Sequence, residues 1–179
     1  MERTIKSKLA LSALSALVVT PLFLTPGAAF AETVNNKGTD ANYIGGGAAA
    51  GITNGGQTGD AATLGYQVQG RYAVPNTPVS LRGAVLASDE TSAIIPMVSV
   101  DVPVMKNTNV YFGAGYSFVE QDGQPTPLGN EDAAVLAVGA ETQIGSHLMI
   151  YGDTKLGIDA YQNSPASAVS IQLGAGYAF

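Results

Sequence analysis

The chain has 179 residues with no Cys, 22 Gly and only 12% charged residues, a composition that suits one domain with an extensive apolar surface. The absence of Cys excludes a disulfide framework, a thiolate metal site and a cysteine-linked lipid anchor. The formal net charge of −6 makes the chain a poor binder of phosphate backbones, so we expect no nucleic-acid partner.

The N-terminal segment has the pattern of a signal peptide. A basic region precedes the apolar stretch 9–24, and Ala29-Phe30-Ala31 matches an A-x-A cleavage site. A membrane-anchor helix is the alternative, but 16 residues that include Ser, Thr and Pro fall short of the roughly 20 that a span needs. We therefore predict an exported protein, with a signal peptide at residues 1–31 cleaved after Ala31 and a short periplasmic lead at residues 32–40.

Eight segments of residues 41–179 alternate between apolar residues and small or polar residues. This period of two is typical of β-strands, whose successive side chains point to opposite faces. In the last segment, Val169, Ile171 and Leu173 alternate with Ser170 and Gln172. The predicted strands span residues 42–52, 63–74, 79–86, 93–104, 110–119, 134–144, 148–161 and 167–179.

The connections between these segments alternate in length. Those that follow odd-numbered strands are as long as or longer than those that follow even-numbered strands, at residues 53–62, 87–92, 120–132 and 162–166 against 75–78, 105–109 and 145–147. An up-and-down meander places its turns alternately at its two ends, and outer-membrane barrels have short periplasmic turns and longer outer loops. The pattern therefore predicts that both termini lie at the periplasmic end.

The charged residues of the predicted strands fall on one face. The apolar face contains no Asp, Glu, Lys or Arg, whereas the opposite face carries Arg71, Arg82, Asp101, Glu141, Asp153, Lys155 and Asp159. Alternation alone permits a soluble lipocalin-like barrel with the apolar face inside, or a transmembrane barrel with that face outside. The polar face is rich in Gly, Ala, Ser and Gln, which suit the inside of a narrow barrel better than a surface in water. We therefore predict an all-β fold, an eight-stranded antiparallel up-and-down transmembrane β-barrel.

The end of the chain repeats an internal motif, because Gly174-Ala175-Gly176-Tyr177-Ala178-Phe179 nearly duplicates residues 113–118. With its eight alternating segments and terminal aromatic residue, the barrel region 41–179 resembles the small eight-stranded outer-membrane β-barrels of Gram-negative bacteria, of the OmpX and OmpA transmembrane-domain type. The resemblance implies an outer-membrane location among lipid and lipopolysaccharide. It also implies that Tyr177 and Phe179 form the C-terminal signal read by the barrel-assembly machinery. Pro96 departs from the pattern, so we expect a bulge or a lost ladder bond there.

The sequence contains few candidate catalytic residues. His147 is the only histidine and lies in a predicted periplasmic turn, so a His-Ser acyl-transfer pair cannot form at the outer rim. The outer loops carry Asp60, Asp89, Glu90, Glu120, Asp122, Glu131 and Asp132. Such carboxylates can bridge divalent ions to lipopolysaccharide phosphates, but their spacing matches no calcium loop, and an acidic, solvated rim is the simpler account. We expect no catalytic residue, cofactor or metal site.

The inward charges form the one constellation with a candidate role. Buried charges in a narrow lumen are costly unless they are paired, so we expect two sets in the periplasmic half. The sets are Arg71/Arg82/Asp101 and Glu141/Asp153/Lys155. They suit either a gate for ions or a structural plug, and the plug is favoured because eight strands leave an interior just wide enough for side chains.

These observations predict a monomeric, non-enzymatic integral outer-membrane protein with a plugged polar lumen and a structural or surface-interaction role. A narrow porin-like ion channel is the alternative. A soluble periplasmic ligand-binding barrel is the third possibility.

Overall fold

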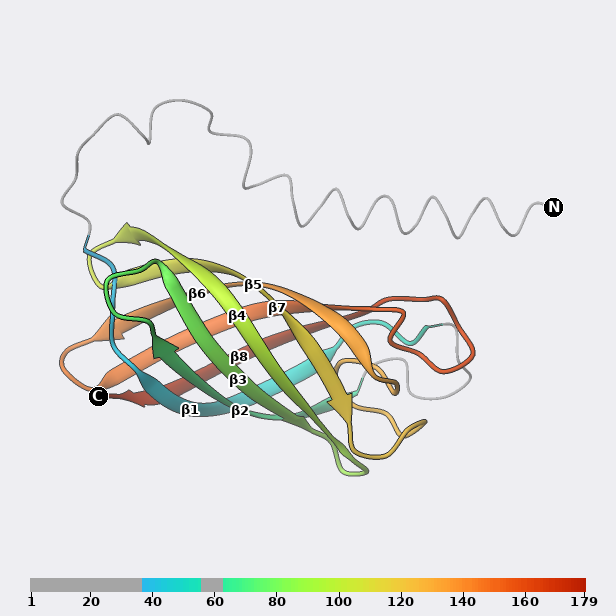
Figure 1. Cartoon of the computed structure of the whole chain (residues 1–179). Coiled ribbons are helices and arrows are strands. Elements are labelled where there is room, and N and C mark those ends of the chain that lie inside the picture. Colours follow the sequence, from blue (N-terminus) through green and yellow to red (C-terminus); the bar gives the residue numbers. More distant parts are fainter. Residues whose placement is uncertain (1–36, 56–62) are drawn as a thin grey trace. The chain divides into compact units, whose positions relative to one another are not determined.

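Eight antiparallel strands form a closed barrel in the computed structural model, which describes residues 37–55 and 63–179 (Figure 1). The strands are β1 (Tyr43–Gly51), β2 (Leu64–Ala73), β3 (Val79–Ala87), β4 (Ser92–Met105), β5 (Thr108–Val119), β6 (Ala133–Ile144), β7 (Leu148–Ile158) and β8 (Ala168–Ala178). Each strand pairs with its sequence neighbours, and β1 closes the barrel against β8. The predicted all-β up-and-down barrel is confirmed. The predicted signal peptide, its cleavage site and Asp60 lie outside the described residues.

Two sequence predictions about the strand ends were wrong. The seventh strand ends at Ile158, and Asp159 lies in the following turn with a φ of 53°. Its side chain is exposed and does not face the lumen. The β3–β4 connection, at residues 88–91, is also shorter than the β2–β3 connection at residues 74–78, so the length alternation fails for this pair. The remaining connections still divide into a short-turn end and a long-loop end. No helix in the described part of the chain is long and apolar enough to cross a membrane.

The apolar face of every strand lies on the outside of the barrel. On β2, Leu64 is 75% exposed and Tyr66 is 72% exposed, whereas Gln67 and Gln69, on the opposite face of the strand, are buried. On β8, Leu173 is 67% exposed. A soluble ligand-binding barrel needs the reverse arrangement, with the apolar face around its ligand. The soluble periplasmic alternative is therefore contradicted.

Pro96 interrupts the sheet on one side only. Its pairing with Gly83 of β3 is kept. On the β5 side, the pairs Ile94–Phe118 and Met97–Gly115 share one register, and the pairing is interrupted between them. The lost ladder contact occurs because proline has no backbone N–H to donate. The register shift of β4 lies elsewhere, between Pro103 and Met105.

Glycines line the inner side of the seam where the barrel closes. Gly45 lies opposite Gly176, and Gly47 lies opposite Gly174. The ring of Tyr151 covers this seam, because a Cβ placed on Gly174 would lie 2.6 Å from the Tyr151 hydroxyl oxygen. The two strands therefore approach closely only because these positions have no side chains.

The seam gives a stability prediction. Gly47→Ala should lower the free energy of unfolding by about 1–3 kcal/mol, since the new Cβ would overlap the Leu173 carbonyl oxygen. Gly83→Ala is the matched control, because its Cβ would have no atom within 4 Å, and we expect a change below about 0.5 kcal/mol. Urea titration followed by heat-modifiable gel mobility measures both variants. Equal unfolding midpoints would contradict the close-packed seam.

Candidate functional site

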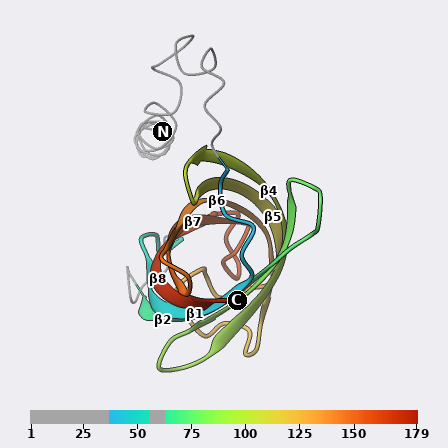
Figure 2. The same ribbon diagram turned by 90° about the vertical axis from the view of Figure 1, so that its left-hand side faces the viewer.

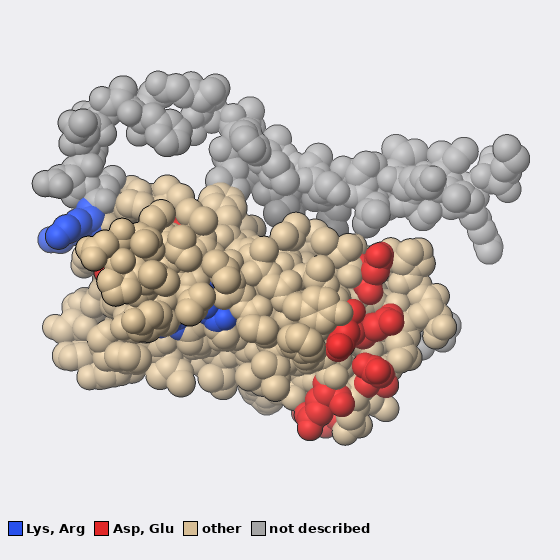
Figure 3. Space-filling view, viewed as in Figure 1, with Lys and Arg blue, Asp and Glu red and all other residues tan. Residues whose placement is uncertain are grey.

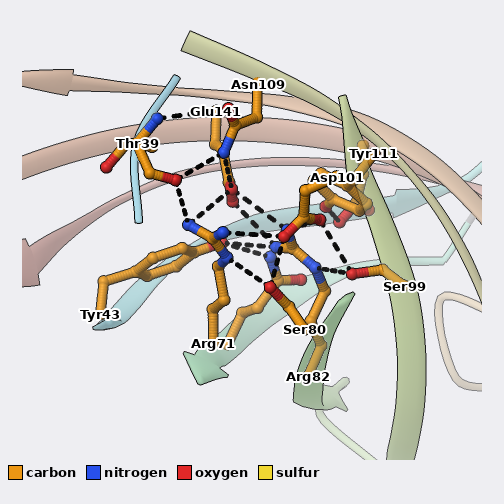
Figure 4. Close-up of polar contacts among 12 residues, drawn as sticks. Thr39, Tyr43, Arg71, Ser80, Arg82, Ser99, Asp101, Asn109, Tyr111 and Glu141 are labelled. Carbon is orange, nitrogen blue, oxygen red and sulfur yellow. Dashed lines mark hydrogen bonds and ion pairs between the residues drawn. The ribbon is translucent and has the colours of Figure 1, made fainter. Parts of the chain in front are cut away.

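Four charged side chains from four strands meet inside the barrel near its short-turn end (Figure 4). Arg82 of β3 pairs with Glu141 of β6, Nη1 to Oε2, at 2.9 Å and with Asp101 of β4, Nη2 to Oδ1, at 2.9 Å. Arg71 of β2 pairs with the same two carboxylates, at 2.8 Å to Asp101 and 3.1 Å to Glu141. Two cations and two anions thus alternate in a closed cycle, which we call the charge ring.

Hydroxyl groups and an aromatic ring complete the coordination of the charge ring. Ser80 accepts a hydrogen bond from Arg71 Nε at 2.9 Å and donates one to Asp101. Ser99 accepts from Arg82 Nε at 2.8 Å and also donates to Asp101. The Arg82 guanidinium lies 3.6 Å from the ring centroid of Tyr111, a cation–π contact. Each buried charge is therefore offset by opposite charge and hydrogen bonds, as burial requires.

The prediction that Glu141 would join Asp153 and Lys155 was wrong. Lys155 Nζ lies 2.6 Å from Asp153 Oδ1, but Glu141 pairs with the two arginines. The reason is the strand register, which places Glu141 opposite Tyr151, two residues closer to the short-turn end than Asp153. Tyr111 connects the two groups, since its hydroxyl donates to Asp153 Oδ2 at 2.5 Å while its ring contacts the charge ring.

An N-terminal segment, residues 37–42, closes the short-turn end of the barrel. We call it the strap, and Figure 2 shows it crossing the opening before β1 begins. The carbonyl oxygen of Thr39 accepts hydrogen bonds from Arg71 Nη1 at 3.1 Å and from Asn109 Nδ2 at 2.7 Å. The Thr39 side chain is buried, and its hydroxyl donates to Gln143 Oε1 at 2.7 Å. The sequence analysis placed residues 37–40 in a periplasmic lead and residues 41–42 at the start of the barrel, because residues 37–40 have no periodic pattern.

The long-loop end is closed by the β5–β6 loop. Residues 126–130 at its tip are buried, and Leu128 is 1% exposed within an apolar cluster that includes Leu86 and Val135. The sequence analysis did not predict this buried tip. A lone leucine in a loop rich in Pro and Gly was the available signal for it. The acidic side chains described at this end lie outside the tip and are on the surface of the barrel (Figure 3).

Hydrogen bonds tie the long loops to one another. Asn130 N donates to Ala160 O at 2.9 Å, which joins the β5–β6 loop to the β7–β8 loop. Tyr161 donates to Thr53 O at 2.5 Å, which joins the β7–β8 loop to the β1–β2 loop. Burial raises the pKa of the Tyr161 hydroxyl, so it remains a protonated donor. Ser88 of the β3–β4 turn donates to Pro125 O at 2.8 Å. These loops form one connected cap.

The remaining predicted residues lie at the short-turn end. His147 stacks on Tyr177 with ring centroids 5.1 Å apart, and it is exposed. Tyr177 is 57% exposed and Phe179 is 70% exposed, both on the outside of the barrel. Within residues 37–55 and 63–179, no three His, Asp or Glu side chains are grouped so that they could hold a metal ion.

The charge ring gives a second stability prediction. Glu141→Gln should lower the free energy of unfolding by about 3–5 kcal/mol, because it leaves two buried guanidinium groups with one carboxylate. Glu90→Gln removes an exposed carboxylate at the other end and should change stability by less than about 0.5 kcal/mol. Chemical unfolding in micelles measures both, and equal midpoints would mean that the charge ring contributes nothing.

The chain is similar to known proteins in its three-dimensional structure but not in its sequence. No family model matches the sequence, and no curated protein matches it. The N-terminal β-barrel domain of Pseudomonas aeruginosa OprF superimposes with a TM-score of 0.52 at 11% identity, covering 80% of this chain and 100% of that one.

Two further crystal structures are similar. Ail, the attachment invasion locus protein of Yersinia pestis, has a TM-score of 0.48 at 16% identity and covers 78% of this chain and 99% of its own. Neisserial surface protein A has a TM-score of 0.48 at 12% identity and covers 78% and 96%. The closed barrel of this chain, with its apolar face outward and its polar face inward, has the fold of the small eight-stranded outer-membrane β-barrels.

Proposed function

We propose that this protein is a small, monomeric, non-enzymatic protein of the outer membrane of a Gram-negative bacterium, with a structural or surface-interaction role in the envelope. One observation carries the proposal: a belt of exposed apolar side chains surrounds a barrel whose lumen is filled by paired charges. Export by a signal peptide cleaved after Ala31 is part of the proposal, since an outer-membrane protein must first leave the cytoplasm.

The belt supports a membrane location. Leu81, Val98 and Leu136 come from three different strands and are each about half exposed. A contiguous apolar surface of this extent is unfavourable in water and favourable in lipid. Strands of 9 to 14 residues match the length that a tilted strand needs to cross a bilayer. Outward aromatic side chains lie near both ends, as interfacial girdles do: Tyr66, Tyr72, Phe112, Tyr116, Phe118, Tyr177 and Phe179.

Closure at both ends favours a plug over an ion gate. The charge ring and strap obstruct the short-turn end, and Leu128 with its connected cap obstructs the long-loop end. An ion would have to displace both. The narrow porin-like channel therefore remains the second candidate, supported only by the charged character of the lumen.

The orientation follows from the proposed location. The short-turn end, with both the strap and the C-terminus, faces the periplasm, and the acidic long-loop end faces outward among lipopolysaccharide. Exposure of Tyr177 and Phe179 on the last strand leaves them accessible to the barrel-assembly machinery, in line with the proposed assembly signal.

The membrane location predicts the behaviour of a charged variant. Leu173→Arg places a charge at the middle of β8 on the outer face, which costs about 2–4 kcal/mol at the bilayer midplane, so the barrel should fail to assemble. Ser146→Arg adds the same charge in an exposed turn and should assemble normally. Fractionation of expressing cells and heat-modifiable gel mobility measure both. Wild-type protein in the soluble periplasm would refute the proposal.

A plugged lumen predicts that the barrel conducts no ions. Wild-type barrel in planar bilayers should show no steps above baseline, and Glu141→Gln should not open it, because the cap around Leu128 remains in place. A gate predicts the opposite result for this variant. Discrete conductance steps that increase in Glu141→Gln would make the narrow channel the better account.

A further inference from the structure

We propose that the short-turn mouth of the barrel is a binding site for an extended peptide segment, and that the strap occupies this site as an intramolecular ligand. The inference goes beyond the proposed function, because it concerns what one end of the barrel recognises. It rests on the contacts of residues 37–42 with the lumen, on the shape of the site at Gly38 and on a cavity beside the strap.

The mouth binds the strap through backbone groups. Asn109 donates from Nδ2 to Thr39 O at 2.7 Å and accepts from Thr39 N at 3.2 Å, so one side-chain amide reads both backbone groups of one residue. Asn107 N donates to Lys37 O at 3.0 Å. Recognition by backbone groups depends little on the side chains of the bound segment, so an extended segment other than the strap can make the same bonds.

Arg71 favours a bound peptide backbone at the mouth, because it donates hydrogen bonds to two carbonyl groups of the strap. Its Nη1 donates to Thr39 O at 3.1 Å and to Ala41 O at 3.2 Å. Arg71 is 5% exposed with the strap in place, and loss of the strap removes two carbonyl acceptors from its Nη1. The remaining ion pairs, with Asp101 and Glu141, hold the guanidinium in place for the next carbonyl groups. An empty mouth is therefore preorganised to take an extended backbone.

Two features of the strap define the preferred ligand. A Cβ on Gly38 would overlap Asn109 Oδ1 and lie 2.9 Å from Pro103 Cβ, so a larger residue would have to displace the Asn109 amide, and glycine is favoured here. The next residue donates its hydroxyl to Gln143 Oε1 at 2.7 Å. The matching ligand is an extended peptide in which glycine precedes threonine or serine.

The mouth has space beside the strap for another peptide segment to enter. A cavity of about 250 Å³ lies beside the strap, lined by strap residues, by Arg71 and Asp101, and by Thr77 and Pro78 of the β2–β3 turn. The strap is thus held by residues of β2, β5 and β6, and two of them, Arg71 and Asn109, also line this cavity. Lys37 and Asp40 are exposed, so the segment can be replaced without opening the barrel wall.

Peptide binding by a strapless barrel tests the proposal. The variant lacking residues 32–40 is purified in detergent micelles, with heat-modifiable mobility as the check that the barrel is closed. A fluorescent peptide of residues 35–40, which spans only strap positions that this variant lacks, should raise its anisotropy on the variant and bind the full chain at least about 10-fold more weakly. The same peptide carrying Gly38→Val is the matched control, and it should also bind at least about 10-fold more weakly. A closed strapless barrel that ignores the peptide, or that binds both peptides equally, overturns the proposal.

A second measurement uses the intact chain, should the deletion prevent closure. The chain has no Cys, so single Thr39→Cys and Asp40→Cys variants report on adjacent buried and exposed strap positions. Maleimide should label Thr39→Cys about 100-fold more slowly than Asp40→Cys, and excess wild-type peptide should accelerate that labelling by displacing the strap. Equal labelling rates, or a rate that the peptide leaves unchanged, overturn the proposal. Both measurements use micelles, so a failure of the outer-membrane proposal would not change their outcome.

Discussion

The charge ring is the constraint on which the rest of the barrel depends. Its members come from β2, β3, β4 and β6, so it holds together strands that are not all neighbours. A slip of one residue in any of these strands would turn its charged side chain to the apolar outer face. The ring therefore selects a single register, and the cost of the wrong register is a charge in an apolar environment. The same constraint explains why the ring is balanced in charge and supplied with Ser80, Ser99 and Tyr111 as additional partners.

The ring also explains the strap. The two carboxylates of the charge ring cannot accept from every N–H of two guanidinium groups. The backbone carbonyls of Thr39 and Ala41 supply the missing acceptors for Arg71. The segment before β1 is thus structurally part of the barrel interior, although it contributes no strand.

The sequence allowed the strands and their facing to be predicted because both depend on a local period of two. Leu173 outward and Gln172 inward follow directly from that alternation. The partners of Glu141 did not follow, because the relative height of residues on β6 and β7 depends on strand stagger, which no single strand records. The strap and the cap were missed for a different reason. Thr39 is bound through its backbone as well as its hydroxyl, and Leu128 enters the lumen from a loop rich in Pro and Gly. Neither interaction has a periodic signature.

The two closures differ in kind, and this difference separates the roles that the two ends can have. At the long-loop end, Leu128 is surrounded by apolar side chains, and the loops around it are bonded to one another, so opening would break several loop contacts at once. At the short-turn end, one short segment lies beside a cavity and is held by hydrogen bonds rather than by an apolar cluster. Opening there needs only the loss of the strap, and its contacts can be remade by another backbone. The cap is therefore suited to a fixed acidic surface, and the mouth is suited to exchange.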